Sequence, residues 1–128
     1  MKTETNLSER LYDFALKIVF LVRSLPREVA AYEIARQLVR SGTSIIANHE
    51  EARGGFSKDD FIYKINLAFK EARETNIWLR LLKDSKILKE ESLTDLIKES
   101  EEIRNILGTS VKTAKLRAGK HKESRNGN

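Results

Sequence analysis

The residues best suited to chemistry lie near the middle of the chain. His49 is followed by two carboxylates, Glu50 and Glu51. A histidine beside carboxylates could belong to a di-metal centre in a helical bundle, but such centres use Glu-x-x-His pairs on two helices. Position 46 is Ile46, and the other histidine, His121, lies near the C-terminus. We therefore predict a hydrogen-bonded histidine at a helix interface, with no metal site and no cofactor.

Hydroxyl groups form a second cluster at Ser41, Thr43 and Ser44. Nucleophilic catalysis would require a base and an orienting acid beside one of them. Hydroxyls inside a helix usually donate to the carbonyl one turn earlier instead. The chain has no cysteine, and it has no nucleophile elbow, P-loop or dinucleotide-binding fingerprint. The sequence disfavours an enzyme and predicts neither catalytic residues nor a small-molecule substrate.

Arginines recur just before these clusters and after them. Arg36 and Arg40 are four residues apart, Arg53 follows, and Glu71 and Glu74 come in the next apolar segment. Paired with these glutamates, the arginines would form an ion-pair lattice across the bundle. Unpaired, they could contact phosphate groups or a partner subunit. The sequence leaves both interpretations open.

The net charge of +5 comes from the C-terminal end of the chain. From position 112 onward there are six basic residues and one acidic residue, whereas residues 1–111 carry 18 of each. The six are Lys112, Lys115, Arg117, Lys120, Lys122 and Arg125. Such a tail could bind nucleic acid by releasing counterions from phosphates, although it contains no aromatic residue on which a base could stack. The alternative is an appendage that only increases solubility.

The segment 57–85 must organise the rest of the chain. Residues at alternating spacings of four and three predict one apolar seam on a helix, and Thr75 is its only polar member. The seam is Phe61, Ile65, Ala68, Ala72, Thr75, Leu79 and Leu82. Ser57 is the expected N-cap, and Asp59 and Asp60 suit the first turn of the helix. Further apolar residues off the seam predict burial on more than one side.

Similar spacing predicts helices over about 8–25, 28–53, 58–85 and 92–116, with the second and third the longest. At 128 residues, 40% hydrophobic and 34% charged, the chain suits one domain. We predict an all-α, antiparallel, up-down-up-down four-helix bundle over 1–116 and a disordered basic C-terminal tail over 117–128. No apolar run approaches the roughly 20 residues that span a bilayer, and no signal segment is evident, so a cytoplasmic location is expected.

Several large apolar residues fall outside the seams. On a monomer they would form exposed apolar surface, which usually marks an interface. They predict a homo-oligomer through Tyr12, Phe20, Tyr63, Trp78 and Leu81.

One ordered string of spaced residues runs through the first three predicted helices: Leu25-Pro26, Glu28, Tyr32, Gln37-Leu38, Arg40-Ser41, Ser44-Ile45, Asn48, Glu51, Arg53, Ser57, Asp60-Phe61, Ala68, Glu71, Glu74 and Trp78-Leu79-x-Leu81-Leu82. This string resembles the four helix bundle family whose first members were described as proteins encoded in intervening sequences of bacterial 23S ribosomal RNA genes. The resemblance implies an antiparallel four-helix bundle, often a homopentamer. It also implies a fold similar to that of the accessory protein of diversity-generating retroelements, a basic pentamer that works with a reverse transcriptase and nucleic acid.

These observations favour a non-enzymatic homo-oligomeric bundle that binds RNA, DNA or a nucleoprotein partner. The alternative is a protein-interaction or scaffold module that does not bind nucleic acid. The expected nucleic-acid contacts are Arg36, Arg40, Arg53, Lys112, Lys115, Arg117, Lys120, Lys122 and Arg125.

Overall fold

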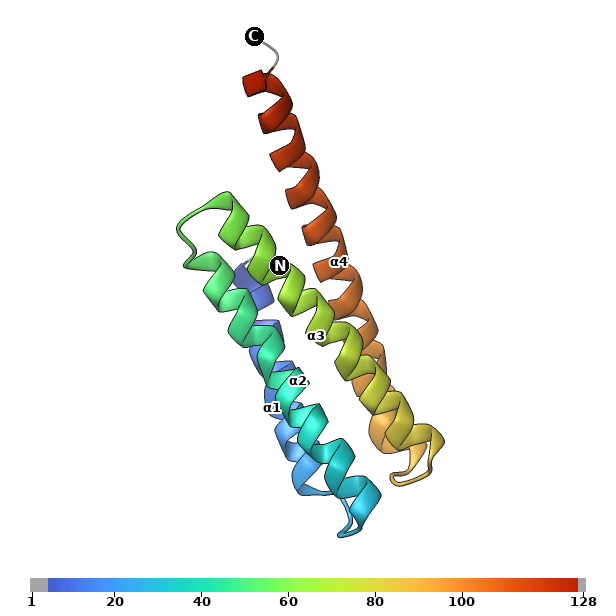
Figure 1. Cartoon of the computed structure of the whole chain (residues 1–128). Coiled ribbons are helices and arrows are strands. Elements are labelled where there is room, and N and C mark those ends of the chain that lie inside the picture. Colours follow the sequence, from blue (N-terminus) through green and yellow to red (C-terminus); the bar gives the residue numbers. More distant parts are fainter. Residues whose placement is uncertain (1–4, 127–128) are drawn as a thin grey trace.

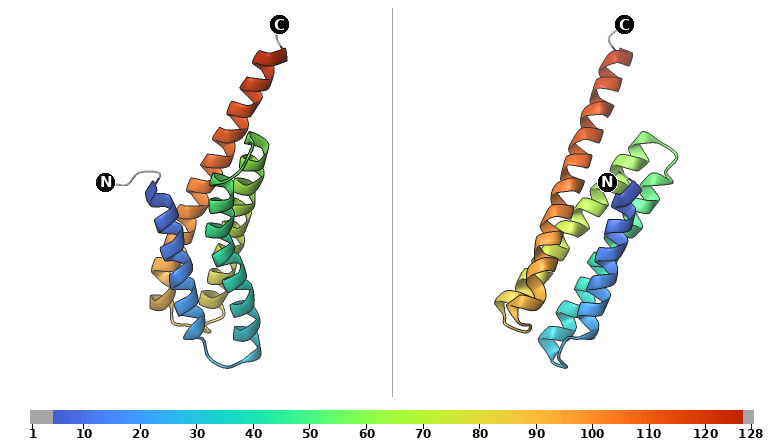
Figure 2. Two further views of the ribbon diagram at one scale, coloured as in Figure 1. Left: turned by 90° about the vertical axis from the view of Figure 1, so that its left-hand side faces the viewer. Right: turned by 180° about the vertical axis from the view of Figure 1, so that it is seen from behind.

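The computed structural model describes the backbone of residues 5–126 and the side chains of residues 6–120. Over this part of the chain it contains four helices and no strand: α1 (Thr5–Arg23), α2 (Val29–Arg53), α3 (Lys58–Asp84) and α4 (Glu90–Asn126). The chain reverses direction at each connection, so neighbouring helices are antiparallel (Figures 1 and 2). The predicted all-α, up-down-up-down four-helix bundle is confirmed. No helix in the described part of the chain is apolar over a length sufficient to cross a membrane.

Local signals place the helix ends. Ser57 caps α3, because its side-chain oxygen accepts a hydrogen bond from the Asp60 N–H at 3.1 Å. Asp59 and Asp60 lie in the first turn, where negative charge complements the helix dipole. Gly54 follows the last residue of α2. The turn between α3 and α4 contains Lys86 in the left-handed region, at φ 62°.

The core lies around α3, which packs against α2 on one side and α4 on the other. α1 packs mainly on α2 and meets α4 over only a short stretch. The predicted seam of α3 is buried from Ile65 to Leu82, Thr75 included. Phe61 is the exception, with 36% of its surface exposed. It lies in the first turn of α3, at one end of the bundle, where fewer neighbours cover it.

Two glycines bring neighbouring helices close together. A Cβ atom at Gly42 of α2 would lie 3.1 Å from Ile18 Cγ2 of α1. A Cβ atom at Gly108 of α4 would lie 3.0 Å from Phe69 Cε1 of α3. These distances are shorter than ordinary van der Waals contacts. The absence of a side chain at both positions therefore sets the separation between the helices.

The largest difference from the sequence prediction concerns α4. It is the longest helix, with 37 residues, and it continues ten residues past the predicted end at 116. Helix α4 thus extends into the predicted C-terminal tail as far as Asn126, while 127–128 lie outside the described residues. Extending an existing helix requires no new nucleus, and the added segment contains no proline. The end of α4 projects beyond the α2–α3 turn (Figure 1), which agrees with the absence of an apolar periodicity there.

Candidate functional site

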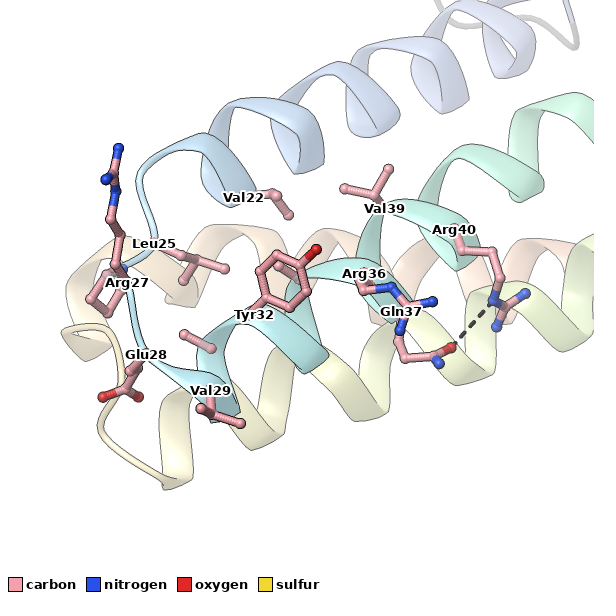
Figure 3. A pocket seen from close by; sticks show the side chains of 13 residues that line it. Val22, Leu25, Arg27, Glu28, Val29, Tyr32, Arg36, Gln37, Val39 and Arg40 are labelled. Carbon is pink, nitrogen blue, oxygen red and sulfur yellow. Dashed lines mark hydrogen bonds between the residues drawn. The ribbon is translucent and has the colours of Figure 1, made fainter.

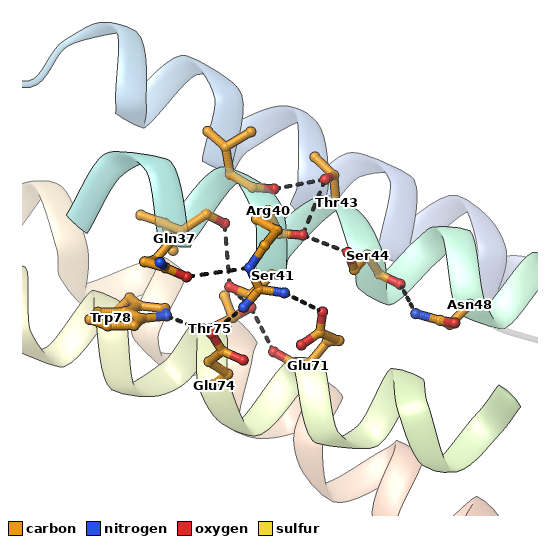
Figure 4. A network of polar contacts seen from close by, with 12 residues as sticks. Gln37, Arg40, Ser41, Thr43, Ser44, Asn48, Glu71, Glu74, Thr75 and Trp78 are labelled. Atoms are coloured by element: carbon orange, nitrogen blue, oxygen red, sulfur yellow. Dashed lines mark hydrogen bonds and ion pairs between the residues drawn. The ribbon is translucent and has the colours of Figure 1, made fainter. Parts of the chain in front are cut away.

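An ion-pair lattice joins α2 to α3. The Arg40 guanidinium donates to Glu71 Oε2 at 3.0 Å and also to Glu74 Oε1 (Figure 4). The hydrogen bond with Glu74 raises the pKa of Arg40. Burial opposes ionisation of Glu74, but hydrogen bonds from Arg40 and Trp78 lower its pKa overall. Of the two interpretations that the sequence left open, the ion-pair lattice is the one that Arg40 adopts.

The other two predicted arginines of α2 also have acceptors within the chain. Arg36 Nη1 lies 3.4 Å from Glu33 Oε2, one turn earlier on an exposed helix face. Arg53 Nη1 donates to Ser8 Oγ at 2.7 Å and lies 3.5 Å from Glu50 Oε1. A phosphate would therefore have to compete with these contacts at each of the α2 arginines.

The hydroxyl cluster stabilises α2 and its contact with α3. Thr43 Oγ1 donates to the Val39 carbonyl at 2.7 Å, and Ser44 Oγ donates to the Arg40 carbonyl at 2.6 Å. Ser41 is fully buried and lies 2.9 Å from Thr75 Oγ1 across the helix interface (Figure 4). Donation to carbonyls one turn earlier is as predicted, and none of these three hydroxyls lies beside an imidazole in the described contacts.

His49 lies at the interface of α2 and α1, as predicted. Its side chain is buried, Nδ1 lies 3.5 Å from Ser8 Oγ, and the Glu50 carboxylate is 3.7 Å away. Burial is the main reason that the pKa of His49 is lowered. A hydrogen bond involving Ser8 is the main cause of the lowered pKa of Glu50. Among the described residues no three His, Cys, Asp or Glu side chains are grouped so that they could hold a metal ion.

The basic residues of the tail belong to the outer part of α4. Lys112, Lys115, Arg117 and Lys120 are exposed, and no carboxylate lies among residues 112–120. We call residues 112–126 of this helix the α4 extension. The side chains of Lys122 and Arg125 lie outside the described residues. The extension therefore presents four exposed cations on a stretch of helix without a carboxylate.

Exposed apolar residues were predicted at five positions, and four of them are exposed. Tyr12, Phe20, Tyr63 and Leu81 lie on the surface. Trp78 is half-buried against the core, and its indole N–H donates to Glu74 Oε1 at 3.1 Å. The exposed Leu16 was missed, although its spacing of four residues from Tyr12 and from Phe20 makes all three one stripe on α1. Ile77, which is exposed four residues before Leu81, was missed in the same way.

A broad apolar groove of about 1110 Å³ runs along the first half of α2 and the end of α1. Val22 and Leu25 contribute from the α1 side, and Val29, Tyr32 and Val39 contribute from α2 (Figure 3). Val29 and Tyr32 are largely exposed. This surface could not be predicted from residue spacing, because its walls come from two helices.

A second hollow, of about 720 Å³, lies where the α2–α3 turn approaches α4. We call it the turn crevice. Phe56 of the turn and Phe61 of α3 line it, together with three cations, Arg53, Lys58 and Arg117. Phe56 is fully exposed. The crevice thus places two aromatic rings beside the α4 extension, whose own sequence contains none.

The fold and these surfaces define an all-α antiparallel four-helix bundle with exposed apolar faces and a basic helical extension. The model of the 23S rRNA-intervening sequence protein family matches residues 3–109. The chain belongs to this family, which confirms the resemblance read from the sequence. The matched region ends just before the α4 extension.

A solved structure is similar over most of the chain. It is a protein of unknown function from the S23 ribosomal protein family of Bacteroides thetaiotaomicron, with 38% sequence identity and a TM-score of 0.76. The match covers 82% of this chain and 97% of that chain. No curated protein matches the chain.

Proposed function

We propose that this chain is a non-enzymatic, self-associating helical bundle that binds nucleic acid through the α4 extension. The observation that carries the proposal is the position of four exposed cations, Lys112, Lys115, Arg117 and Lys120, on a helix that projects past the bundle. At 3.6 residues per turn these positions face several directions around the helix. Each cation placed against a phosphate releases counterions, so the extension suits a polyanion.

The extension is also suited to a polyanion because its charges repel one another. Lys112 and Lys115 are three residues apart, as are Arg117 and Lys120, and like charges at this spacing destabilise a helix. A bound phosphate backbone would relieve this repulsion. By comparison, Arg40 would first have to leave Glu71 and Glu74, and Arg36 and Arg53 already lie near Glu33 and Glu50. The α4 extension is therefore the principal contact that we propose.

Self-association is supported by the α1 stripe of Tyr12, Leu16 and Phe20, all exposed on one helix face. Burying such a stripe against another copy would remove apolar surface from water. The assembly that we propose is the homopentamer implied by the family resemblance. In a ring, several α4 extensions would act on one polynucleotide, and this would raise the apparent affinity by avidity.

The test is the salt dependence of binding to a labelled RNA, measured by fluorescence anisotropy with the assembled full chain. Replacing Lys112, Lys115, Arg117 and Lys120 with Gln should lower the slope of log K against log salt. Each phosphate contact that is lost reduces the slope by about 0.7 to 0.9, so the four together reduce it by up to about 3.6 per chain. Assembly mass, measured by light scattering, should not change.

The matched control removes the same charge elsewhere. Lys17, Lys70, Lys89 and Lys98 are exposed and lie on other parts of the molecule, so their replacement with Gln should leave most of the slope intact. Equal losses in the two variants would mean that only net charge matters and would contradict the assignment to α4. Binding that ignores salt, or no binding at low salt, would overturn nucleic-acid binding itself.

The second candidate function is a protein-interaction scaffold without nucleic-acid binding. The groove lined by Val29 and Tyr32 favours it, because both side chains are largely exposed and exposed apolar surface often marks interfaces (Figure 3). This candidate predicts that a purified protein partner is retained by the wild type and lost by Tyr32→Ala. It also predicts that RNA is not retained at low salt.

A further inference from the structure

We propose that the turn crevice holds the bases of a single-stranded polynucleotide, while the cations around it hold the phosphates. This inference rests on the proposed function and specifies its ligand. Figure 1 shows the arrangement: the α2–α3 turn and the start of α3 lie beside the point where α4 leaves the bundle. Three elements that are distant in sequence thus form one hollow.

The aromatic side chains supply stacking surfaces. Phe56 is fully exposed in the turn, and Phe61 leaves 36% of its surface open in the first turn of α3. Both line the crevice. Neither ring is needed to fill the core, and a fully exposed phenylalanine gains nothing from folding. Nucleobases stack on such rings whatever their sequence, because every base has a π-face.

The charges in the crevice favour a polyanion. Arg53, Lys58 and Arg117 line it, and its lining contains no carboxylate. Both Arg53 contacts, with Ser8 and with Glu50, use Nη1, so the guanidinium keeps further N–H donors for a phosphate. Asp59 and Asp60 lie in the first turn of α3 but do not line the crevice.

Small residues leave room for the ligand. Gly55, Ala114 and Ala118 also line the crevice, and the hollow measures about 720 Å³. Pockets that bind small organic groups commonly have volumes of about 300 to 1,000 Å³. One or two stacked bases therefore fit without movement of the bundle.

Combined stacking and phosphate contacts select for single strands. The bases of a duplex are already stacked on one another, so only a single strand can place a base against Phe56. A protein that used the α4 extension alone would bind duplexes at least as well, because their charge density is higher. Binding through the crevice therefore predicts a preference for single strands over duplexes, whereas binding through the α4 extension alone does not.

The experiment compares a 12-nucleotide oligouridylate with an RNA duplex of the same length, using the full-length assembled protein and fluorescence anisotropy. Phe56→Ala and Phe61→Ala should each weaken oligouridylate binding about tenfold, the effect of losing one stacked base. Neither substitution should change duplex binding or the salt slope. Arg117→Gln should lower the salt slope by about 0.7 and keep the preference for single strands. Oligouridylate carrying 5-iodouridine should crosslink to Phe56 on irradiation.

Tyr32→Ala is the matched control, because Tyr32 is an exposed aromatic residue that lies outside the turn crevice. Circular dichroism and light scattering verify that each variant is folded and assembled. If salt-dependent binding remains but both Phe variants equal the control, the inference is overturned and the proposed function stands. If the wild type binds neither RNA at low salt, both are overturned. A fall in assembly mass on Phe56→Ala, with RNA binding unchanged, would assign the crevice to a second copy and overturn the inference.

Discussion

Arg10 joins the first and last helices through an ion pair with Glu99, and its removal should open the bundle there. Its guanidinium binds Glu99 in a bidentate manner, with Nε–Oε2 at 2.7 Å and Nη2–Oε1 at 2.6 Å, and Glu102 lies 3.4 Å from Nη2. The pair is mostly shielded, because the side-chain exposures of Arg10 and Glu99 are only 22% and 27%. The hydrogen bonds with Glu99 raise the pKa of Arg10, so Arg10 keeps its charge at neutral and alkaline pH.

The expected cost follows from this geometry. Hydrogen bonds to charged groups contribute about 1.5 to 3 kcal/mol, whereas exposed ion pairs contribute about 0 to 1 kcal/mol. A shielded but still solvent-accessible bidentate pair should lie between these limits, so Arg10→Met should lower the free energy of unfolding by about 1 to 2 kcal/mol. Because α1 meets α4 over only a short stretch, few other contacts can compensate. Hydrogen exchange should rise first in the backbone of α1.

The assay is urea denaturation of Arg10→Met, Glu99→Gln and the double variant, at fixed protein concentration. The coupling energy of this cycle should be about 1 kcal/mol or more, and it should decrease between 0.1 and 1 M salt as screening increases. Arg36→Met is the control, because its partner Glu33 is three residues away and both side chains are more than half exposed, so it should cost at most about 0.5 kcal/mol. Additive effects of Arg10→Met and Glu99→Gln would refute the reasoning.

Two further predictions concern buried polar groups. Burial lowers the pKa of His49 below 6.5, so the unfolded chain takes up a proton first. The contribution of His49 to the free energy of unfolding should be fully present above about pH 6.5, and it should decrease as the pH falls below that value. In His49→Gln, the free energy of unfolding measured by urea denaturation should vary less between pH 7.5 and 5. An unchanged pH dependence in this variant would mean that other groups cause it. Thr75→Val should lower the free energy of unfolding by about 1 to 2 kcal/mol. The substitution leaves the buried Ser41 hydroxyl with only a 3.4 Å contact to the Leu38 carbonyl. Ser41→Ala removes that hydroxyl. Urea denaturation should therefore show that the double variant loses less unfolding free energy than the two single variants together, and strictly additive losses would contradict a hydrogen bond between Ser41 and Thr75.

The helices could be predicted because their signals are local. Seam residues such as Ile65 and Leu79 repeat at helical spacing, and they are buried in the structure. Ser57 predicted the start of α3 because an N-cap acts within one turn. The end of α4 was missed because the sequence beyond residue 116 carries no apolar periodicity. In that segment helix continuation, not packing, decides the conformation.

The contacts between helices were harder to predict. Asn76 lies one residue off the seam, yet it is buried and donates to Ser100 Oγ at 2.9 Å, because α3 faces α4 as well as α2. Arg10 and Glu99 are 89 positions apart, and no spacing rule connects them. Arg40 was a candidate for phosphate contact until the structure placed Glu71 and Glu74 beside it.

The sequence by itself determined the helical class, the caps, most of the α3 seam and the location of the positive charge at the C-terminal end. These properties depend on residue type and on spacing within a few helical turns, and both can be read directly from the sequence. Only the tertiary structure decided which charges are already paired and that Phe56 lies beside Arg117 at the turn crevice. Such proximity depends on how the helices pack, and that packing depends on side-chain volumes at many interfaces at once, including the absence of a side chain at Gly42 and Gly108.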